Sequence, residues 1–329
     1  MMDRHTRMYD LEYPSPEVVT TPDNGPTLIV ALQGYADAGH AVESSAHHLL
    51  HALEHRPVAS FHSDELIDYR SRRPAATIAE NQLADMEDAR LELRVFRDNS
   101  GTPFLLLAGP EPDMRWNAFT EAVIGLIDRF HVDKTVCLYA APMAVPHTRP
   151  LVVTAHGNTP SMLQQHFTMG ATIRVPGSAA LLLEHRLQQT GHKVGGFTAH
   201  VPHYVASSEF PEATLKLLRA VERAAGLDLP LDSLELDVER TAVQLNEQTE
   251  ESQEIQRVLK ILESQYDQDL ERYVARSEQS EISRDSNMPT GDELGAEFER
   301  FLQSLDSRAL DSGMEPPAST DDEAQEDKN

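Results

Sequence analysis

The sequence is poor in cysteine, in tryptophan and in positive charge. Its 329 residues include one Cys and one Trp, and 28 Lys and Arg stand against 54 Asp and Glu. A single cysteine, Cys137, permits neither an internal disulfide nor a thiolate metal cage. The formal net charge of -26 argues against a nucleic-acid binder that neutralises phosphates, and equally against docking on an anionic membrane.

Long hydrophobic runs are missing as well. No run of about 18 apolar residues is present, so no segment is expected to span a bilayer. The first residues, MMDRHTRMYDLEYPSP, contain no apolar stretch that could form the core of a signal peptide. Since 40% of the residues are apolar, a real core is expected, and we predict a soluble cytoplasmic protein.

The negative charge is concentrated at the C-terminal end. Residues 228–329 hold 28 acidic and 9 basic residues, whereas all fifteen histidines lie at or before His203. This change predicts a domain boundary near Asp228. Two interpretations stay open for the acidic part: a solvated helical appendage, or an arm that grips a basic partner or mimics nucleic acid. The predicted domains are an extended lead-in (1–25), a sandwich (26–228), an acidic helical extension (229–307) and a disordered acidic tail (308–329).

Short apolar runs alternate with helical periodicity up to about residue 228. A run such as TLIVALQG (27–34) is typical of a strand buried on both faces. Repeated strand–helix–strand order predicts a three-layer α/β/α sandwich with a mostly parallel sheet. The predicted strands are 27–34, 57–62, 91–96, 103–109, 135–141, 151–156 and 195–201, and the predicted helices are 37–53, 116–130, 178–189, 211–225, 234–245, 255–273 and 294–305.

Several chemically capable side chains follow predicted strands. Loops at the carboxyl ends of parallel strands hold ligands in open α/β sheets. Glu111 and Asp113 could act as acid and base, and His147 beside Arg149 suits an anion. The candidate ligand pocket consists of Asp37, Glu111, Asp113, Arg115, His147, Arg149 and His203.

Each of these motifs also has a structural interpretation. GYADAG (34–39) could be a tight turn in which Asp37 itself takes the anion position at the helix start. Asp113 could cap the following helix, while Trp116 fills the core. Arg149 could pair with a nearby carboxylate such as Glu111.

The segment DELIDYRSRRP (64–74) interleaves acids and tyrosine with arginines. Arginine forks bind carboxylates or phosphates, but the same pattern suits an ion-pair network at a subunit interface. The candidate interface consists of Asp68, Tyr69, Arg70, Arg72 and Arg73.

Motifs for metals, nucleotides and nucleophiles are missing. There is no GxGxxG, Walker loop or GxSxG, and Cys137 lies in an apolar strand. His47, His51 and His55 are four residues apart, a spacing that can present zinc ligands, but the HExxH pattern is absent. A helix face with polar histidines is favoured, and we predict neither a metal nor a cofactor.

The motifs GYADAG, DELIDYRSRRP, GPEPDMRW, VPHTRP and AHVPHY, followed by LESQYD and EFERFL, resemble the proteasome assembly chaperone 2 family, in its actinobacterial-type branch. The resemblance covers about residues 26–305. It implies a sandwich similar to nucleoside phosphorylases and related hydrolases, with a helical C-terminal region. Some members of the family chaperone proteasome assembly through protein–protein contact, and archaeal relatives have been catalogued as ATP-grasp-like ligases.

The chain departs from the family pattern in two loops. Tyr35 and Ala36 stand where many relatives have Trp and Asn, and MGATIRVPGS (169–178) replaces a Gly-Pro-Thr-Gly turn of other branches. Both departures concern loops that would shape a ligand site.

Two functions of different classes follow. The favoured one is a non-enzymatic, chaperone-like factor that binds an unidentified protein partner as a homo-oligomer, a trimer by fold analogy. The alternative is a small-molecule-binding enzyme, phosphorylase- or hydrolase-like or an ATP-dependent ligase, with a phosphate- or carboxylate-bearing ligand at the strand ends. A ligand-free structural oligomer with a decayed site is the third possibility.

Overall fold

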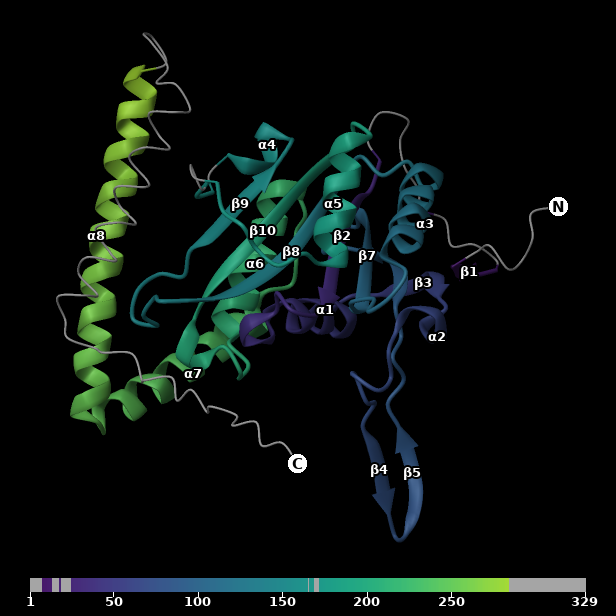
Figure 1. Ribbon diagram of the computed structural model, residues 1–329, viewed down its shortest axis with the longest axis horizontal. Coiled ribbons are helices and arrows are strands. Elements are labelled where there is room, and N and C mark those ends of the chain that lie inside the picture. Colours follow the sequence, from purple (N-terminus) through teal and green to yellow (C-terminus); the bar gives the residue numbers. More distant parts are fainter. Residues whose placement is uncertain (1–7, 14–17, 19–24, 165, 169–171, 284–329) are drawn as a thin grey trace, which may run out of the picture. The chain divides into compact units, whose positions relative to one another are not determined.

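A computed structural model describes residues 8–13, 18, 25–164, 166–168 and 172–283 (Figure 1). Its centre is an eight-stranded sheet with the order β1-β3-β6-β7-β2-β8-β10-β9. The strands are β1 (Tyr9–Leu11), β2 (Thr27–Gln33), β3 (His55–Phe61), β6 (Glu92–Arg97), β7 (Pro103–Pro110), β8 (Lys134–Met143), β9 (Val153–Gly157) and β10 (Lys193–Pro202).

The sheet is mixed, with a parallel centre. Strands β7, β2, β8 and β10 pair in parallel, and β1, β3 and β6 extend one side through antiparallel pairs. Strand β9 closes the other side antiparallel to β10. Because β3 is two antiparallel steps away from β7, it runs in the same direction as the centre. Most strands therefore point one way, as the alternating sequence pattern predicts.

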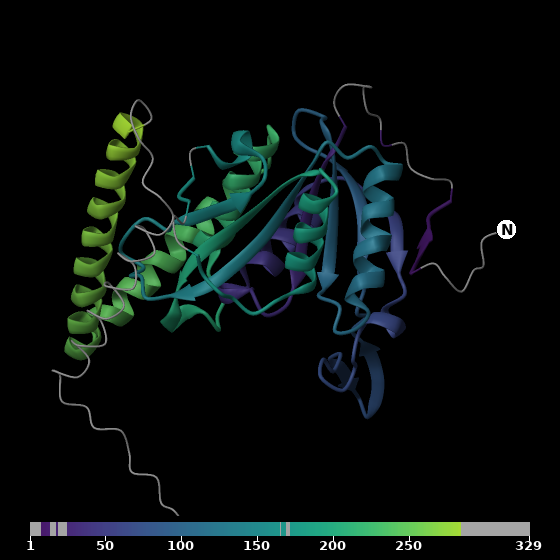
Figure 2. The ribbon, with the colours of Figure 1, turned by 45° about the horizontal axis from the view of Figure 1, so that its top comes forward.

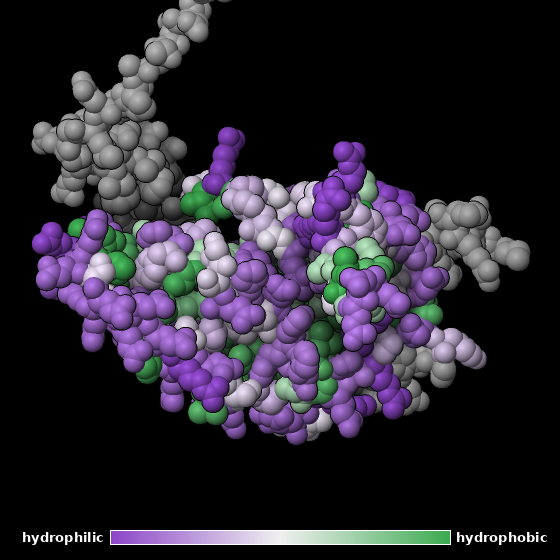
Figure 3. Space-filling model, turned by 90° about the horizontal axis from the view of Figure 1, so that it is seen from below, coloured by the Kyte–Doolittle hydropathy of each residue, from purple (hydrophilic) through white to green (hydrophobic). Residues whose placement is uncertain are grey.

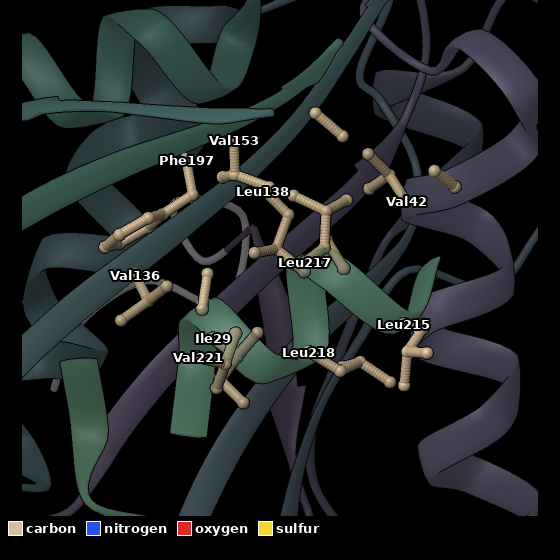
Figure 4. Packing of buried hydrophobic residues seen from close by; sticks show 14 of the residues in the cluster. Ile29, Val42, Val136, Leu138, Val153, Phe197, Leu215, Leu217, Leu218 and Val221 are labelled. Carbon is tan, nitrogen blue, oxygen red and sulfur yellow. The ribbon is translucent and has the colours of Figure 1, made fainter. Parts of the chain in front are cut away.

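Helices cover both faces of the sheet (Figures 1 and 2). On one face, α1 (Ala41–Ala52) and α6 (Pro211–Ala225) pack with Ile29 and Ala31 of β2. On the other face, α3 (Trp116–Arg129) and α5 (Ala179–Gln189) pack with the alternate β2 residues, among them Val30. Figure 4 shows residues of the first core, which include Leu217 and Val221 of α6 and the sheet residues Val136, Leu138 and Phe197. This is the predicted three-layer α/β/α sandwich.

The sequence marks several helix ends correctly. Ser178 accepts a hydrogen bond from the Leu181 amide at 3.1 Å and caps α5. Pro211 opens α6, and Gly226, with φ of 71°, ends it in the left-handed conformation that glycine adopts without strain.

The acidic part of the chain begins with two helices, α7 (Asp232–Glu250) and α8 (Gln253–Ser283). The chain divides into two compact units, and the second begins at Leu270, inside α8. The predicted helix over 294–305 and the predicted tail over 308–329 lie outside the described residues. Among the helices that the structure describes, none combines the length and apolar character needed to cross a membrane.

Several elements were not predicted. Strands β4 (Ala76–Ala79) and β5 (Gln82–Met86) form a separate antiparallel hairpin. The short helices α2 (Ser63–Leu66) and α4 (Pro160–Leu163) follow strands β3 and β9. The predicted helix face with three histidines is wrong for one of them: α1 ends at Ala52 and Leu53 is extended, so His55 belongs to β3 and does not share a face with His47 and His51.

Candidate functional site

The loop after β2 uses its acidic residue to start helix α1. The two carboxylate oxygens of Asp37 accept hydrogen bonds from the Val42 amide at 2.7 Å and the Glu43 amide at 3.2 Å. Burial raises the pKa of Asp37. The side chain thus occupies the position that a bound anion would take at this helix start.

Glu111, at the end of β7, serves a second helix. It is buried, and its Oε1 accepts a 2.6 Å hydrogen bond from the Ala179 amide at the first turn of α5. A Cβ atom at Gly34 would lie 2.0 Å from Glu111 Oε2, so a glycine is needed there to admit the carboxylate. Glu111 therefore fastens α5 to the sheet, where the helix dipole favours its negative charge.

Asp113 joins the predicted pocket to the predicted interface. It accepts a 2.8 Å hydrogen bond from the Asp68 amide and lies 3.2 Å from the Arg72 Nε. Arg72 also donates to the Gln33 carbonyl at 3.0 Å. The prediction that Asp113 caps α3 is wrong: the residue before α3 is Arg115, in the left-handed region and without a side-chain cap.

The other residues of these two sets have local partners. Arg115 pairs with Glu65. Burial raises the pKa of Tyr69, and a hydrogen bond to Asp64 raises it further. Arg70 and Arg73 are exposed. The candidate interface is therefore one continuous surface with Asp113, on the side of the sheet where β3 and β7 end.

His147 and Arg149 lie in the connection between β8 and β9. His147 Nδ1 is 2.8 Å from the hydroxyl of Tyr204, which packs edge-on against His203. Burial lowers the pKa of His147, and within the described residues its buried Nε2 has no hydrogen-bond partner. The contacts of His147 therefore involve neither Glu111 nor Asp113 of the predicted ligand pocket.

The partners of Arg149 come from helix α8. Its Nε and Nη2 each donate a 2.8 Å hydrogen bond to Asp267, and its Nη1 lies 3.2 Å from Glu263. The hydrogen bond from Arg149 lowers the pKa of Asp267. The Tyr266 hydroxyl donates to the Pro150 carbonyl at 2.7 Å. The suggested pairing of Arg149 with Glu111 is therefore wrong, and α8 is fastened to this connection instead.

A small cavity lies beneath these contacts. It is lined by His147 and Arg149 together with residues that include His200, Glu212 and Tyr266. Burial lowers the pKa of His200 to about 4 and raises that of Glu212. The cavity volume of about 10 Å³ is room for roughly one water molecule. The described residues thus leave no space for a metabolite here in this arrangement.

A polar cluster that the sequence analysis missed lies on the α5 face. Glu184 is buried on α5, and its oxygens lie 3.1 Å from His156 Nε2 and 3.1 Å from the Tyr139 hydroxyl. The hydrogen bond to Glu184 raises the pKa of His156, whereas burial raises those of Tyr139 and Cys137. The sequence pattern gave no signal for this cluster, because Tyr139, His156 and Glu184 belong to three separate elements that only the tertiary fold brings together. No group of three metal-ligating side chains is found among the described residues.

Comparison with known proteins places the chain in a family. The model of the PAC2 family matches residues 31–249. A Corynebacterium glutamicum protein of unknown function is similar in structure, with 59% identity, coverage of 81% of this chain and 100% of that one, and a TM-score of 0.79. A Mycobacterium tuberculosis protein of unknown function shares 45% identity, covering 82% and 92% of the two chains, with a TM-score of 0.79.

A third neighbour carries a functional description. It is a proteasome-assembly chaperone homologue of Mycobacterium tuberculosis, 26% identical, covering 71% of this chain and 99% of that one, with a TM-score of 0.65. Among curated proteins no match is found. The family match extends over more than half of the sequence and agrees with the sandwich described above. The chain therefore belongs to the PAC2 family.

Proposed function

We propose that this chain is a non-enzymatic, protein-binding factor of the assembly-chaperone type, which works as a homo-oligomer in the cytoplasm and has proteasome subunits as its partners. The observation that carries the proposal is the similarity to a proteasome-assembly chaperone homologue, which covers 71% of this chain and 99% of that protein. Proteins of this type act through surfaces rather than through a reaction centre.

The use of polar side chains at the strand ends supports this proposal. Asp37 and Glu111 each accept a hydrogen bond from a backbone amide at the first turn of a helix, and Arg149 binds Asp267 of α8. A group that acts on a substrate must reach it within about 3 Å or through one water. These side chains are already engaged with the protein's own backbone and ion pairs.

The surface of the acidic helices supports it as well. On α8, the exposed apolar residues Ile255, Val258 and Ile261 are 50%, 49% and 59% accessible. On α7, Leu236 and Val243 are 54% and 56% accessible. Apolar side chains set among acids would contact a partner whose surface combines hydrophobic and basic residues.

A tagged full-length chain, purified natively from its own organism, tests the proposal. We expect proteasome subunits in stoichiometric amounts by mass spectrometry, and a homo-oligomer of the free chain by light scattering. Replacing Ile255→Glu together with Val258→Glu should remove the subunits. The control Gln253→Glu with Gln265→Glu adds the same charge at exposed polar positions of α8 and should retain them. Absence of proteasome subunits from every sample would contradict the proposal.

One observation favours a second candidate, a small-molecule binder at the cavity next to Arg149. His147 lines this cavity and has a buried, unpartnered Nε2. Binding would require α8 to release the connection between β8 and β9. A thermal-shift screen of nucleotides and phosphorylated metabolites tests this, since a ligand at 100 times its Kd adds about 2.7 kcal/mol. Equal shifts in the wild type and in His147→Ala would rule the cavity out as the binding site.

A further inference from the structure

Helix α1 carries two exposed histidines on its outer side. His47 and His51 are both exposed and are four residues apart, a spacing that places them one turn apart on the same side of an α-helix. The buried residues of the helix, among them Val42, Ala46 and Leu49, belong to the core that α1 shares with α6. Because this packing holds the backbone of α1 in place, the two imidazoles leave the helix from fixed positions.

One hydrogen bond decides which nitrogen of His51 is available. Its Nδ1 lies 2.7 Å from the carbonyl oxygen of His47. A carbonyl oxygen only accepts, so Nδ1 carries the proton, and the lone pair of the neutral ring is on Nε2. Histidines that bind metals typically donate their other ring N–H to a carbonyl or a carboxylate in this way. The backbone of α1 therefore orients His51 as a ligand through Nε2.

The two rings lie next to each other. Their centroids are 5.9 Å apart. Among the residues that the structure describes, the His47 imidazole contacts the His51 ring and forms neither a hydrogen bond nor an ion pair, so its nitrogens are available. A zinc ion lies about 2.0–2.1 Å from each ligating nitrogen, and two histidines at this helical spacing can share one ion.

The other histidines near α1 are engaged elsewhere. His48 Nε2 lies 2.6 Å from the Pro230 carbonyl oxygen, and His40 Nδ1 lies 3.2 Å from Glu43. His55 belongs to β3. Polar side chains dominate the surface seen in Figure 3, so exposure alone does not mark a site. The remaining pair is distinguished by its spacing and by the direction of its free nitrogen.

We propose that His47 and His51 form a site for one divalent metal ion of the zinc, copper or nickel type. The protein ligands are Nε2 of His51 and one ring nitrogen of His47, and water fills the remaining positions. Imidazole nitrogens suit these metals, whereas magnesium and calcium prefer oxygen ligands. The net charge of -26 also attracts a cation. The ion joins two turns of α1 and exchanges readily, and the site does not depend on the proposed function.

Calorimetric titration of the metal-free, full-length chain without a polyhistidine tag tests the site, with Zn²⁺ as the probe. The wild type should bind one ion here at about pH 7.5, and His47→Ala and His51→Ala should each weaken the binding roughly tenfold or more. His185→Ala removes another exposed histidine, on α5, and should bind like the wild type. Circular dichroism should show unchanged folding, because the replaced side chains are exposed and alanine favours a helix.

A displaced histidine separates chelation from histidine content. His51→Ala with Ala52→His keeps the number of histidines but places the pair five residues apart, on different sides of the helix. This variant should bind zinc as weakly as His51→Ala. With Cu²⁺ as the probe, electron paramagnetic resonance should show two nitrogen ligands in the wild type and one in the displaced variant. Zinc should be released at about pH 5, where an ordinary imidazole is protonated.

Three results would overturn the proposal. The first is a wild type without saturable binding at hundreds of micromolar zinc. The second is equal affinity of the wild type and the displaced variant. The third is an equal loss in His185→Ala and His51→Ala, because zinc would then bind exposed histidines at large, as an adventitious ion only. Capture of proteasome subunits tests the proposed function separately, since none of these results concerns it.

Discussion

Arg149 holds Asp267 through two parallel hydrogen bonds of 2.8 Å, although the two residues are 118 positions apart. Such a bidentate contact fixes direction as well as distance. It joins the connection between β8 and β9 to the part of α8 that belongs to the first compact unit. Together with the contacts of Glu263 and Tyr266, it ties α8 up to Asp269 to this connection and so positions the exposed residues at the start of the helix.

Loss of this contact should loosen α8 without unfolding the sandwich. In Arg149→Ala, the residues of α8 up to Asp269 should exchange their amide hydrogens faster, because the contacts to Asp267 and Glu263 are lost. Hydrogen–deuterium exchange with mass spectrometry measures this directly. Arg240→Ala removes an exposed pair with Asp237 within α7 and is the matched control. Equal protection of α8 in both variants would show that Arg149 does not hold the helix.

The fold was largely predictable because its local signals agree. The apolar run of β2, the Ser178 cap and the Gly226 stop each follow from neighbouring residues alone. The β4–β5 hairpin has alternation but a weak turn sequence, Glu80-Asn81, and its strand residues are exposed among the residues that the structure describes. Its exposure removes the hydrophobic contrast on which strand prediction depends.

The stability of the protein should depend on pH through His156. Its folded pKa is raised, chiefly by the hydrogen bond to Glu184, above the ordinary value of 6.5. A raised pKa means that the stabilisation is complete below about pH 6.5 and is lost as the pH rises through the folded pKa. Tyr139 and Cys137, which flank the pair, stay protonated in this range, since burial raises both pKa values.

Thermal melts between pH 6 and pH 9 check this prediction. The wild type should lose stability relative to His156→Gln as the pH rises, by less than about 1 kcal/mol, since the imidazole is 47% exposed and screened by water. The pKa values of His147 and His200 are lowered, so these residues change stability with pH in the opposite direction and below pH 6.5. Both are present in the wild type and in His156→Gln, so their contributions cancel in the difference. A constant difference across the range would contradict the role given to His156.

Gly196 leaves the space in which His156 and Glu184 meet. A Cβ atom there would lie 2.6 Å from His156 Nε2 and 2.7 Å from Glu184 Oε2. Gly196→Ala should therefore separate the pair and destabilise the protein by about 1–3 kcal/mol, measured by urea denaturation. Gly125→Ala, inside α3 with nothing within 4 Å, should be neutral or stabilising by up to about 1 kcal/mol. Similar effects of the two substitutions would show that the close approach is relieved elsewhere.

The candidate site was harder to predict than the fold. Asp37, Glu111 and Arg149 were singled out as candidate ligand-binding groups, and in the structure their hydrogen bonds go to Val42, Ala179 and Asp267. Sequence spacing shows that a carboxylate follows a strand; it does not show which distant helix the carboxylate will meet. The same reason explains why the His156–Glu184 pair was missed, since β9 and α5 are joined only by the tertiary fold.

The most direct test of the central claim mixes the purified full-length chain with purified proteasome subunits from the same organism. Light scattering should show a new species whose mass equals the chain plus its subunits, in a fixed ratio. The species should disappear for Ile255→Glu with Val258→Glu and persist for Gln253→Glu with Gln265→Glu. Unchanged masses for the wild-type chain and the subunits, at concentrations of tens of micromolar, would contradict an assembly-factor role.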